Sequence, residues 1–414
     1  RYMERLQDKL NRLGCELKTT ISATAMDLWN REFYNPLMHP IFKISDKEER
    51  LMRKCYYGGR TECFYRGCFE KPLKLYDINS MYPKALTFEY PDTKKMYRIA
   101  SPEHSYINSF GFSYADIEAP EDLFYPFLPY RNAEDKLIFP LGRFKGYYTH
   151  IELKEAERLG YKITLLKSYI FPKSYYPFAE YVSKLYQLRN SDKDYSDVYK
   201  ILLNSLYGKF AQRTDKIQCF IPESCMTDND FKLFSEDDQG DIENGFYIFK
   251  KEMAKPDYIM PIFSAYVTSY SRILLYKYLT KYKAVYCDTD SILTERSIRE
   301  SSELGRMKLE RISSRSILIK PKFYYLYSHY DIIKAKGIRH ITKPEFLNLL
   351  RGKSVKQMKF CKFREALRRN LKVNEILRFA KYMDLEDDKR EWHGKFGLNK
   401  WQKSTPIIID SGSQ

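Results

Sequence analysis

Two stretches decide the fold, KPLKLYDINSMYP at residues 71–83 and AVYCDTDSILT at residues 284–294. The first contains an apolar, strand-forming run that ends at Asp77. The second is expected to form two short strands around a bend, with Asp288 and Asp290 on either side of it. Because side chains alternate along a strand, both of these aspartates should lie on one face. The two stretches therefore predict a site built from carboxylates at strand ends.

Phosphoryl transfer is a reaction that needs such carboxylates. Two divalent ions about 3.5–4 Å apart can align a nucleophile with its leaving group, and they allow acidic side chains to crowd together. The Asp-Thr-Asp pattern alone is weak support, because an Asp-rich turn is more often a solvated hairpin. A catalytic role for the pattern therefore needs support from other residues of the chain.

The pattern belongs to one of four motifs that follow one another in a fixed order along the chain. They are DxxSxYP at 77–83, KxxxNSxYG at 200–208, YxDTDS at 286–291 and KxY at 322–324. In these motifs the chain resembles the family B DNA polymerases, and it is most similar to the protein-primed branch found in phages, linear plasmids and some organelles. The resemblance extends from about residue 56 to the C-terminus.

The resemblance implies a metal site that binds two Mg²⁺ ions, with Mn²⁺ as an alternative. Asp77 and Asp290 would be the principal ligands and Asp288 an auxiliary one. The backbone carbonyl of Ile78 would contact the metal that arrives with the nucleotide. All four residues would belong to the palm subdomain.

The nucleotide site is expected at the first two motifs. Tyr82 would carry the sugar and exclude a 2′-OH by its ring; the alternative is an ordinary core tyrosine. Lys200, Asn204 and Tyr207 share one face of an expected helix because they are four and three residues apart. Lys200 would neutralise the triphosphate, Tyr207 would stack near the new base pair, and Gly208 would allow close backbone approach.

Arg189 is a further candidate for the triphosphate. It precedes Lys200 by eleven residues, about three helical turns, and would return to the same face if the helix extends that far. The alternative is a solvent-facing arginine before the helix begins, since the polar stretch RNSDKDYSD offers Ser and Asp as N-caps.

The expected DNA contacts come from several motifs. The pair Lys322 and Tyr324 resembles the KxY that holds the primer terminus, and strand alternation would point both to one face. The YxGG motif at residues 56–59 would bind the template strand. The full expected set is Tyr56, Gly58, Gly59, Ser80, Thr289, Lys322, Tyr324 and Lys334.

The implied fold is α+β, a right-hand polymerase with a palm of antiparallel sheet and helices, helical fingers, a small thumb and two insertions. The second insertion would serve processivity and strand displacement, although its acidic composition is unusual for a loop that faces DNA. The expected segments are 1–50, a remnant of the connection to an exonuclease domain; 51–89 and 258–330, the palm; 90–172, an insertion that contacts a priming protein; 173–213, the fingers; 214–257, the second insertion; and 331–414, a basic thumb with helices to the terminus.

Charge supports a polyanionic partner. The chain has 71 Lys and Arg against 54 Asp and Glu, a formal charge of +17. Residues 311–404 alone contain 24 basic and 9 acidic residues, so most of the excess lies in the C-terminal quarter. The expected partners are template–primer DNA, dNTPs and, as an optional addition, a terminal protein that primes synthesis.

Other features narrow the class of protein. No long uncharged apolar run is present, so no membrane partner is expected. The eight cysteines lack zinc-binding spacing and indicate a reducing intracellular compartment, which the sequence does not identify further. The first residue is Arg1 within an amphipathic helical pattern, from which we expect that the chain begins inside a larger protein. A monomer is expected.

Three other interpretations of the sequence are disfavoured. Asp116 and Glu118 mimic the D-x-E signature of a proofreading exonuclease, but they follow Asp77 instead of preceding it, which argues against that role. A non-catalytic replisome scaffold is disfavoured because every metal ligand is present. An RNA-synthesising or primer-independent enzyme is disfavoured because Tyr82 should exclude ribonucleotides and DTDS is not the double-Asp turn of reverse transcriptases.

Overall fold

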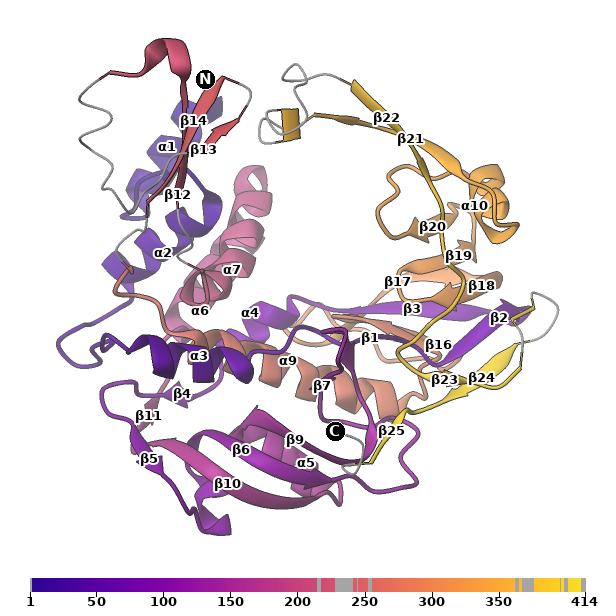
Figure 1. The fold of residues 1–414 in the computed structure, drawn as a ribbon, viewed down its shortest axis with the longest axis horizontal. Coiled ribbons are helices and arrows are strands. Elements are labelled where there is room, and N and C mark those ends of the chain that lie inside the picture. The colour runs from indigo at the N-terminus through magenta and orange to yellow at the C-terminus, as the bar shows by residue number, and fades with distance from the viewer. Residues whose placement is uncertain are drawn as a thin grey trace. The chain divides into compact units, whose positions relative to one another are not determined.

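The computed structural model divides the chain into two compact units (Figure 1). The first unit contains residues 1–212, 257–332 and 386–414, and the second contains 213–256 and 333–385. These units do not coincide with the seven segments expected from the sequence, whose boundaries stay predictions. The structure describes residues 2–213, 217–227, 241–243, 245–251, 255–361, 365–366, 376–394, 396–397 and 401–410.

The first unit contains an antiparallel sheet that we call the palm sheet. Its strand order is β1-β15-β16-β3-β17, so strands from the two deciding stretches lie side by side at its centre. Each central strand is short and mostly buried, as expected for apolar runs that end at turns. The bounds are β1 (Thr61–Cys63), β3 (Leu73–Ile78), β15 (Tyr286–Asp288), β16 (Ser291–Thr294) and β17 (Met307–Ser313).

A long buried helix, α9 (Pro261–Lys281), connects the parts of the first unit. Fourteen of its residues are buried, and apolar side chains cover most of its circumference, which is typical of a helix inside a core. It contacts α3 (Asp46–Lys54), α4 (Met81–Leu86), α5 (His150–Arg158) and α7 (Ser196–Phe210). The helix that carries Tyr82 is therefore fixed against the core.

Residues 90–172 form mainly a second sheet, which we call the insertion sheet. Its strand order is β25-β9-β6-β10-β5, and α5 packs on it. The bounds are β5 (Tyr97–Ile99), β6 (Phe110–Glu118), β9 (Leu141–Thr149), β10 (Lys162–Phe171) and β25 (Ile408–Ile409). Smaller pairs join β4 (Tyr90–Pro91) to β11 (Ser174–Tyr175) and β7 (Tyr130–Arg131) to β8 (Leu137–Ile138).

The expected fingers segment contains two helices, α6 (Ala179–Ser191) and α7 (Ser196–Phe210). They pack on each other, and α2 (Ile21–Glu32) packs on α7, with α1 (Tyr2–Arg12) preceding it. The fully buried ring of Trp29 on α2 contacts Phe210 edge-on at 5.2 Å. The expected Ser or Asp N-cap of the second helix is wrong, because α7 follows a 3₁₀ turn and Tyr195 occupies its cap position without a side-chain hydrogen bond.

The expectation of helices up to the C-terminus is also wrong. Residues after 386 form β23 (Glu391–Trp392), β24 (Gln402–Thr405) and β25, all in the first unit. β24 pairs with β2 (Tyr65–Phe69), and β25 pairs in parallel with β9. A third sheet of the first unit thus has the order β19-β18-β2-β24-β23, where β18 is Arg315–Lys320 and β19 is Phe323–Tyr327.

The second unit contains strands from two regions of the chain. β12 (Ile217–Pro222), β14 (Phe246–Lys251) and β13 (Asp241–Glu243) form an antiparallel sheet, and much of the acidic second insertion lies outside the described residues. The other region contains α10 (Lys343–Leu350) and a pair of strands, β21 (Val355–Phe360) and β22 (Ile376–Lys381). β20 (Ile332–Ala335) spans the boundary between the units. Among the described residues, no helix is long and apolar enough to cross a bilayer.

Candidate active site

The palm sheet aligns the acidic residues of its two central stretches. Asp77 on β3 lies opposite Ser291 on β16, and Ser291 lies opposite Asp288 on β15. Residues directly opposite each other in neighbouring strands project from the same face of a sheet. Asp77 and Asp288 therefore lie on one face, two strands apart.

The bend between β15 and β16 brings Asp290 beside the first stretch. Thr289 has a left-handed backbone (φ 62°), and its N–H donates to the Arg60 carbonyl at 2.7 Å. The N–H of Ile78 donates to the Asp290 carbonyl at 2.7 Å. The left-handed backbone of Thr289 interrupts the strand alternation from which we expected Asp288 and Asp290 to share one face. The hydrogen bond from Ile78 instead places Asp290 next to Asp77.

Asp77 and Asp290 form a poorly compensated anionic pair. Burial, followed by the charges of Asp290 and Glu310, raises the pKa of Asp77 to about 7. Burial is also the largest cause that raises the pKa of Asp290. Lys200 lowers both pKa values, so the helix α7 contributes positive charge to this pair. A bound cation would remove the repulsion between the two carboxylates.

Asp288 has partners of its own. Its Oδ1 accepts hydrogen bonds from the hydroxyls of Thr61 at 3.1 Å and Thr289 at 3.2 Å. The Nζ of Lys322 lies 3.3 Å from the same oxygen. These contacts satisfy one oxygen of Asp288 and reduce its availability as a metal ligand.

The donor set near Asp77 fits a divalent cation in its chemistry. Within the described ranges, no three His, Cys, Asp or Glu side chains group closely enough to hold a metal ion, so the three expected aspartates do not converge as a set. The residues that would hold one are Asp77 and Asp290, with the Ile78 carbonyl following Asp77 directly in the chain. These donors are all oxygen atoms, which Mg²⁺ and Ca²⁺ prefer.

Two tyrosines from different helices stack beside this pair. The rings of Tyr82 on α4 and Tyr207 on α7 have centroids 4.8 Å apart and planes inclined by 15°. A Cβ on Gly59 would come within 2.9 Å of the Thr289 methyl group and 3.3 Å of the Tyr82 hydroxyl. The YxGG loop, the bend and the tyrosine stack therefore meet, and Gly59 is required for that approach.

The other residues of the α7 motif lie at the helix surface. Lys200 and Asn204 are exposed, and the Asn204 amide donates to the Lys200 carbonyl at 2.8 Å. A Cβ on Gly208 would meet no atom of the described protein within 4 Å. The close backbone approach expected at Gly208 therefore does not involve another part of the described chain.

Arg189 reaches the site by a route that the spacing did not predict. The helix does not continue to it: Arg189 lies on α6, and a 3₁₀ turn separates α6 from α7. Its Nη1 nevertheless donates to the hydroxyl of Ser80 at 2.7 Å. Ser80 has a left-handed backbone (φ 50°) at the start of α4, two residues before Tyr82. Arg189 thus stabilises the turn that positions Tyr82.

The expected primer-binding residues differ in their environments. Lys322 precedes β19 and has a left-handed backbone (φ 60°), so the alternation expected for the pair does not apply. Tyr324 is buried on β19, with its ring 5.2 Å from that of Tyr286. Lys334 lies on β20 within the second unit, and Tyr56 is half-buried beside the core. Their roles in DNA binding stay predictions.

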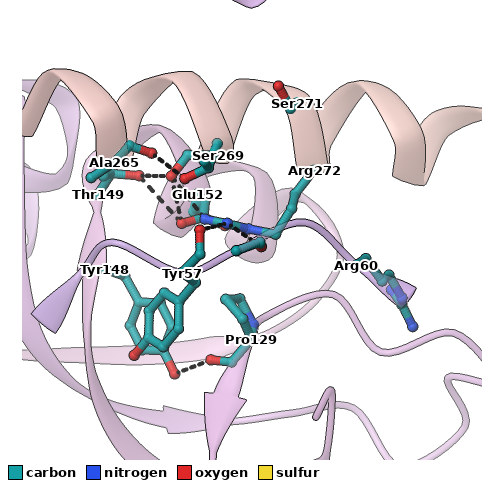
Figure 2. A network of polar contacts seen from close by, with 12 residues as sticks. Tyr57, Arg60, Pro129, Tyr148, Thr149, Glu152, Ala265, Ser269, Ser271 and Arg272 are labelled. Carbon is teal, nitrogen blue, oxygen red and sulfur yellow. Dashed lines mark hydrogen bonds and ion pairs between the residues drawn. The ribbon is translucent and has the colours of Figure 1, made fainter. Parts of the chain in front are cut away.

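Arg272, a buried residue of α9, is a further residue of the site that no sequence motif contains (Figure 2). Its Nε lies 2.8 Å from Oε1 of Glu152 on α5. Its Nη1 donates to the carbonyls of Tyr57 at 2.6 Å and Gly58 at 2.9 Å, inside the YxGG motif. The hydroxyl of Ser269 donates to Glu152 at 2.7 Å and completes the ion pair's hydrogen bonds. A lone arginine in an apolar helical stretch was the signal for it.

The exonuclease-like pair is engaged in ion pairs. Arg143 binds Asp116 through two hydrogen bonds of 3.0 and 2.9 Å and lowers the pKa of that carboxyl. Lys162 pairs with Glu118 at 2.5 Å. Both acids lie on β6 of the insertion sheet, and these contacts support a structural role for them.

Comparison with known proteins gives a family and a fold. The family model of DNA polymerase type B, organellar and viral, matches residues 3–303. A probable DNA polymerase of Ascobolus immersus is 30% identical over 315 residues, which are 70% of this chain and 26% of that protein. The DNA-directed DNA polymerase of Enterobacteria phage PRD1 is 23% identical over 385 residues, 88% of this chain and 65% of that protein.

Among solved structures, the chain is similar to Phi29 DNA polymerase complexed with primer-template DNA and incoming nucleotide substrates. The TM-score is 0.68 at 16% identity, covering 91% of this chain and 69% of that one. This likeness concerns the fold alone, and it confirms the expected α+β right-hand fold. The chain spans about a quarter of the length of the Ascobolus relative.

Proposed function

This chain belongs to the organellar and viral type B DNA polymerases, and from that premise we propose that it is the DNA-synthesising module of a polymerase that replicates a viral, plasmid or other mobile element. In this proposal it adds dNTPs to a 3′-OH in the order that a DNA template dictates. The observation that carries the proposal is the anionic pair Asp77 and Asp290 beside the stack of Tyr82 on Tyr207.

The acidic pair is proposed to hold two Mg²⁺ ions, with Asp288 as an auxiliary ligand and the Ile78 carbonyl as a further donor. When bound, the ions would align the attacking oxygen with the leaving group and neutralise charge on the transferring phosphate. The chain's own contribution is to keep the two carboxylates close together and partly buried, at a bend fixed by backbone hydrogen bonds. Preorganisation of this kind removes the cost of assembling the site during the reaction.

The nucleotide is proposed to lie between the palm and the helix α7. Tyr82 would contact its sugar, and the stacked ring of Tyr207 keeps Tyr82 in one orientation. Lys200 is exposed and acts electrostatically on Asp77 and Asp290, so it can meet a triphosphate bound at the same place. Arg189 would act indirectly, through the hydroxyl of Ser80.

The nucleic acid is proposed to contact the loops around this centre. Lys322 lies beside Asp288 and would reach the primer terminus, while Gly59 and Thr289, which approach each other at the bend, would contact the template. Lys334 is proposed as a further contact to the primer strand. A priming protein that offers a hydroxyl is the proposed optional partner of the insertion sheet, and the module is proposed to act as a monomer in a reducing intracellular compartment.

Primer extension tests the proposal directly. A labelled primer–template is incubated with the chain, Mg²⁺ and either dNTPs or NTPs, and wild type is compared with Asp290→Asn. Asp122→Asn is the matched control, because Asp122 is an exposed aspartate outside the site. We expect extension with dNTPs by wild type and by the control, and loss of at least about a thousandfold in the Asp290 variant. Equal extension by all three proteins would refute the assignment, and DNA binding without extension by any of them would favour a non-catalytic scaffold.

A further inference from the structure

A basic pocket lies beside the YxGG loop (residues 56–59), where the end of α3 meets strands β6 and β9 of the insertion sheet. Its volume is about 420 Å³, and it is open to solvent. None of the lining residues in the described part of the chain is acidic. Five of them are cationic, namely Arg50, Arg53, Lys54, Arg131 and Lys145.

The charge of the basic pocket is only partly compensated. Arg53 and Arg131 each pair with an acidic neighbour, at 2.6 and 3.2 Å. Lys145 lies 3.9 Å from Asp116, a carboxylate that already accepts two hydrogen bonds from Arg143. Arg50 and Lys54 are exposed and have no acidic partner among the residues that the structure describes. The pocket therefore attracts an anion with more than one charge.

Two tyrosines form an aromatic platform in the same pocket. Tyr114 on β6 lies directly opposite Tyr147 on β9, and their ring centroids are 4.8 Å apart with planes inclined by 31°. The Nζ of Lys54 lies 5.2 Å from the centroid of the Tyr147 ring. Both rings are half-buried, and both line the pocket. Aromatic faces framed by cations are the combination that binds unpaired bases together with their phosphates.

The pocket is continuous with the YxGG loop. Tyr57 lines it, and the ring of Tyr57 stacks on that of Tyr148, a residue of β9 in the insertion sheet. The carbonyls of Tyr57 and Gly58 are held by Arg272, so this edge of the pocket is fixed to the core. A DNA strand that passes Gly58 would therefore reach the pocket at Tyr57, the neighbouring residue of the loop.

We propose that the basic pocket binds a single-stranded segment of the DNA template next to the part held by the YxGG loop. A duplex does not fit this chemistry, because its bases are already stacked and present only their edges. An acidic protein segment would use the cations but not the paired ring faces. The inference rests on the proposed function, since the template is the expected ligand.

Direct binding of a labelled oligo(dT) measured by fluorescence anisotropy tests the inference. The variant Arg50→Gln/Lys54→Gln removes the two uncompensated charges, and Lys167→Gln/Lys277→Gln removes two exposed lysines that do not line the pocket. We expect the pocket variant to bind at least about tenfold more weakly. The slope of log K against log salt concentration should become shallower by about 1.4, because each single-strand phosphate contact contributes about 0.7 to it. The control should stay within about twofold of wild type.

A second pair of variants separates stacking from charge. Tyr147→Leu should weaken binding by about fivefold or more, whereas Tyr147→Phe, which keeps the ring, should retain wild-type affinity. Equal affinities of wild type and both pocket variants would overturn the inference. The inference would also be overturned if the pocket variants bound oligo(dT) as tightly as wild type but lost binding to labelled polyglutamate. That result would identify an acidic protein segment as the occupant.

The two proposals can fail separately. Primer extension by wild type reports on the proposed function alone, and oligo(dT) binding needs no catalysis. Primer extension by wild type, together with unchanged oligo(dT) binding by the pocket variants, would refute only the proposed role of the pocket. Loss of oligo(dT) binding without extension by wild type supports the pocket and counts against the polymerase activity of this chain.

Discussion

The acidic pair should destabilise the protein when no cation is bound, and Asp77→Asn tests this. The variant keeps the shape of the side chain but removes the negative charge of Asp77, which burial and the charge of Asp290 make unfavourable. We expect Asp77→Asn to be more stable than wild type in EDTA at about pH 8, even though the substitution removes a residue proposed to be essential.

The magnitude follows from the pKa of Asp77, which is raised from 3.8 to about 7 in the folded protein. Because the folded state holds this proton more tightly than the unfolded chain does, stability falls as pH rises from about 4 to about 7, and the full penalty applies above that range. A change of about three in pKa corresponds to about 4 kcal/mol. Since part of the side chain is open to solvent, which screens the charge, we halve this value to about 2 kcal/mol.

Urea unfolding in EDTA at about pH 5 and about pH 8 measures the effect. The advantage of Asp77→Asn should be about 2 kcal/mol at the higher pH and clearly smaller at the lower one. The control Asp122→Asn should show neither. Added Mg²⁺ should stabilise wild type but not Asp77→Asn, since binding to the folded state alone raises stability. An Asp77 variant that is no more stable than wild type at the higher pH would refute the reasoning.

Three other substitutions test the surroundings of the pair. Tyr82→Val removes the ring expected beneath the sugar, so the ratio of NTP to dNTP incorporation in single-nucleotide extension should rise at least about tenfold, and an unchanged ratio would rule out the steric role. Lys200→Gln should raise the KM for dNTP by about tenfold and leave binding of primer–template unchanged in anisotropy; weaker DNA binding would instead assign Lys200 to the nucleic acid. Arg272→Met leaves Glu152 buried without its partner and should lower the free energy of unfolding in urea by about 3–5 kcal/mol. The double variant Arg272→Met/Glu152→Met should restore part of this loss. A double variant no more stable than the single one would contradict a direct pairing of Arg272 with Glu152.

Local sequence patterns predicted the elements that carry the acidic residues. The apolar run before Asp77 forms β3, which extends one residue further to Ile78. The run containing Lys200, Asn204 and Tyr207 lies within one helix, α7. These features depend on periodicity within about ten residues, which is the range over which hydrophobic patterns report structure. The roles of the residues came from the resemblance and stay predictions.

Features that depend on distant contacts were not predictable in the same way. Thr289 adopts its left-handed backbone where the carbonyl of Arg60, more than two hundred residues earlier, accepts its N–H. Arg189 contacts Ser80 from α6, a helix separate from α7, and the spacing between Arg189 and Lys200 gave no sign of this contact. β24 pairs with β2 across most of the chain length, in a region whose basic composition suggested helices. A pattern read along one segment contains no information on which remote segment will pair with it.

Arg272 shows how far sequence reasoning could have gone. A charged side chain in an apolar helix must find a partner, because an unpaired buried charge costs several kcal/mol. The stretch IFSAYVTSYSRILLYKYL thus implied a buried acceptor, but not that Glu152 and two loop carbonyls would provide it. Because those carbonyls belong to the YxGG loop, the same contacts fix the loop in which Gly59 approaches Thr289 and Tyr82. A residue absent from every motif therefore connects the core to the geometry of the site, and its effect should be seen in the position of the loop more than in the chemistry itself.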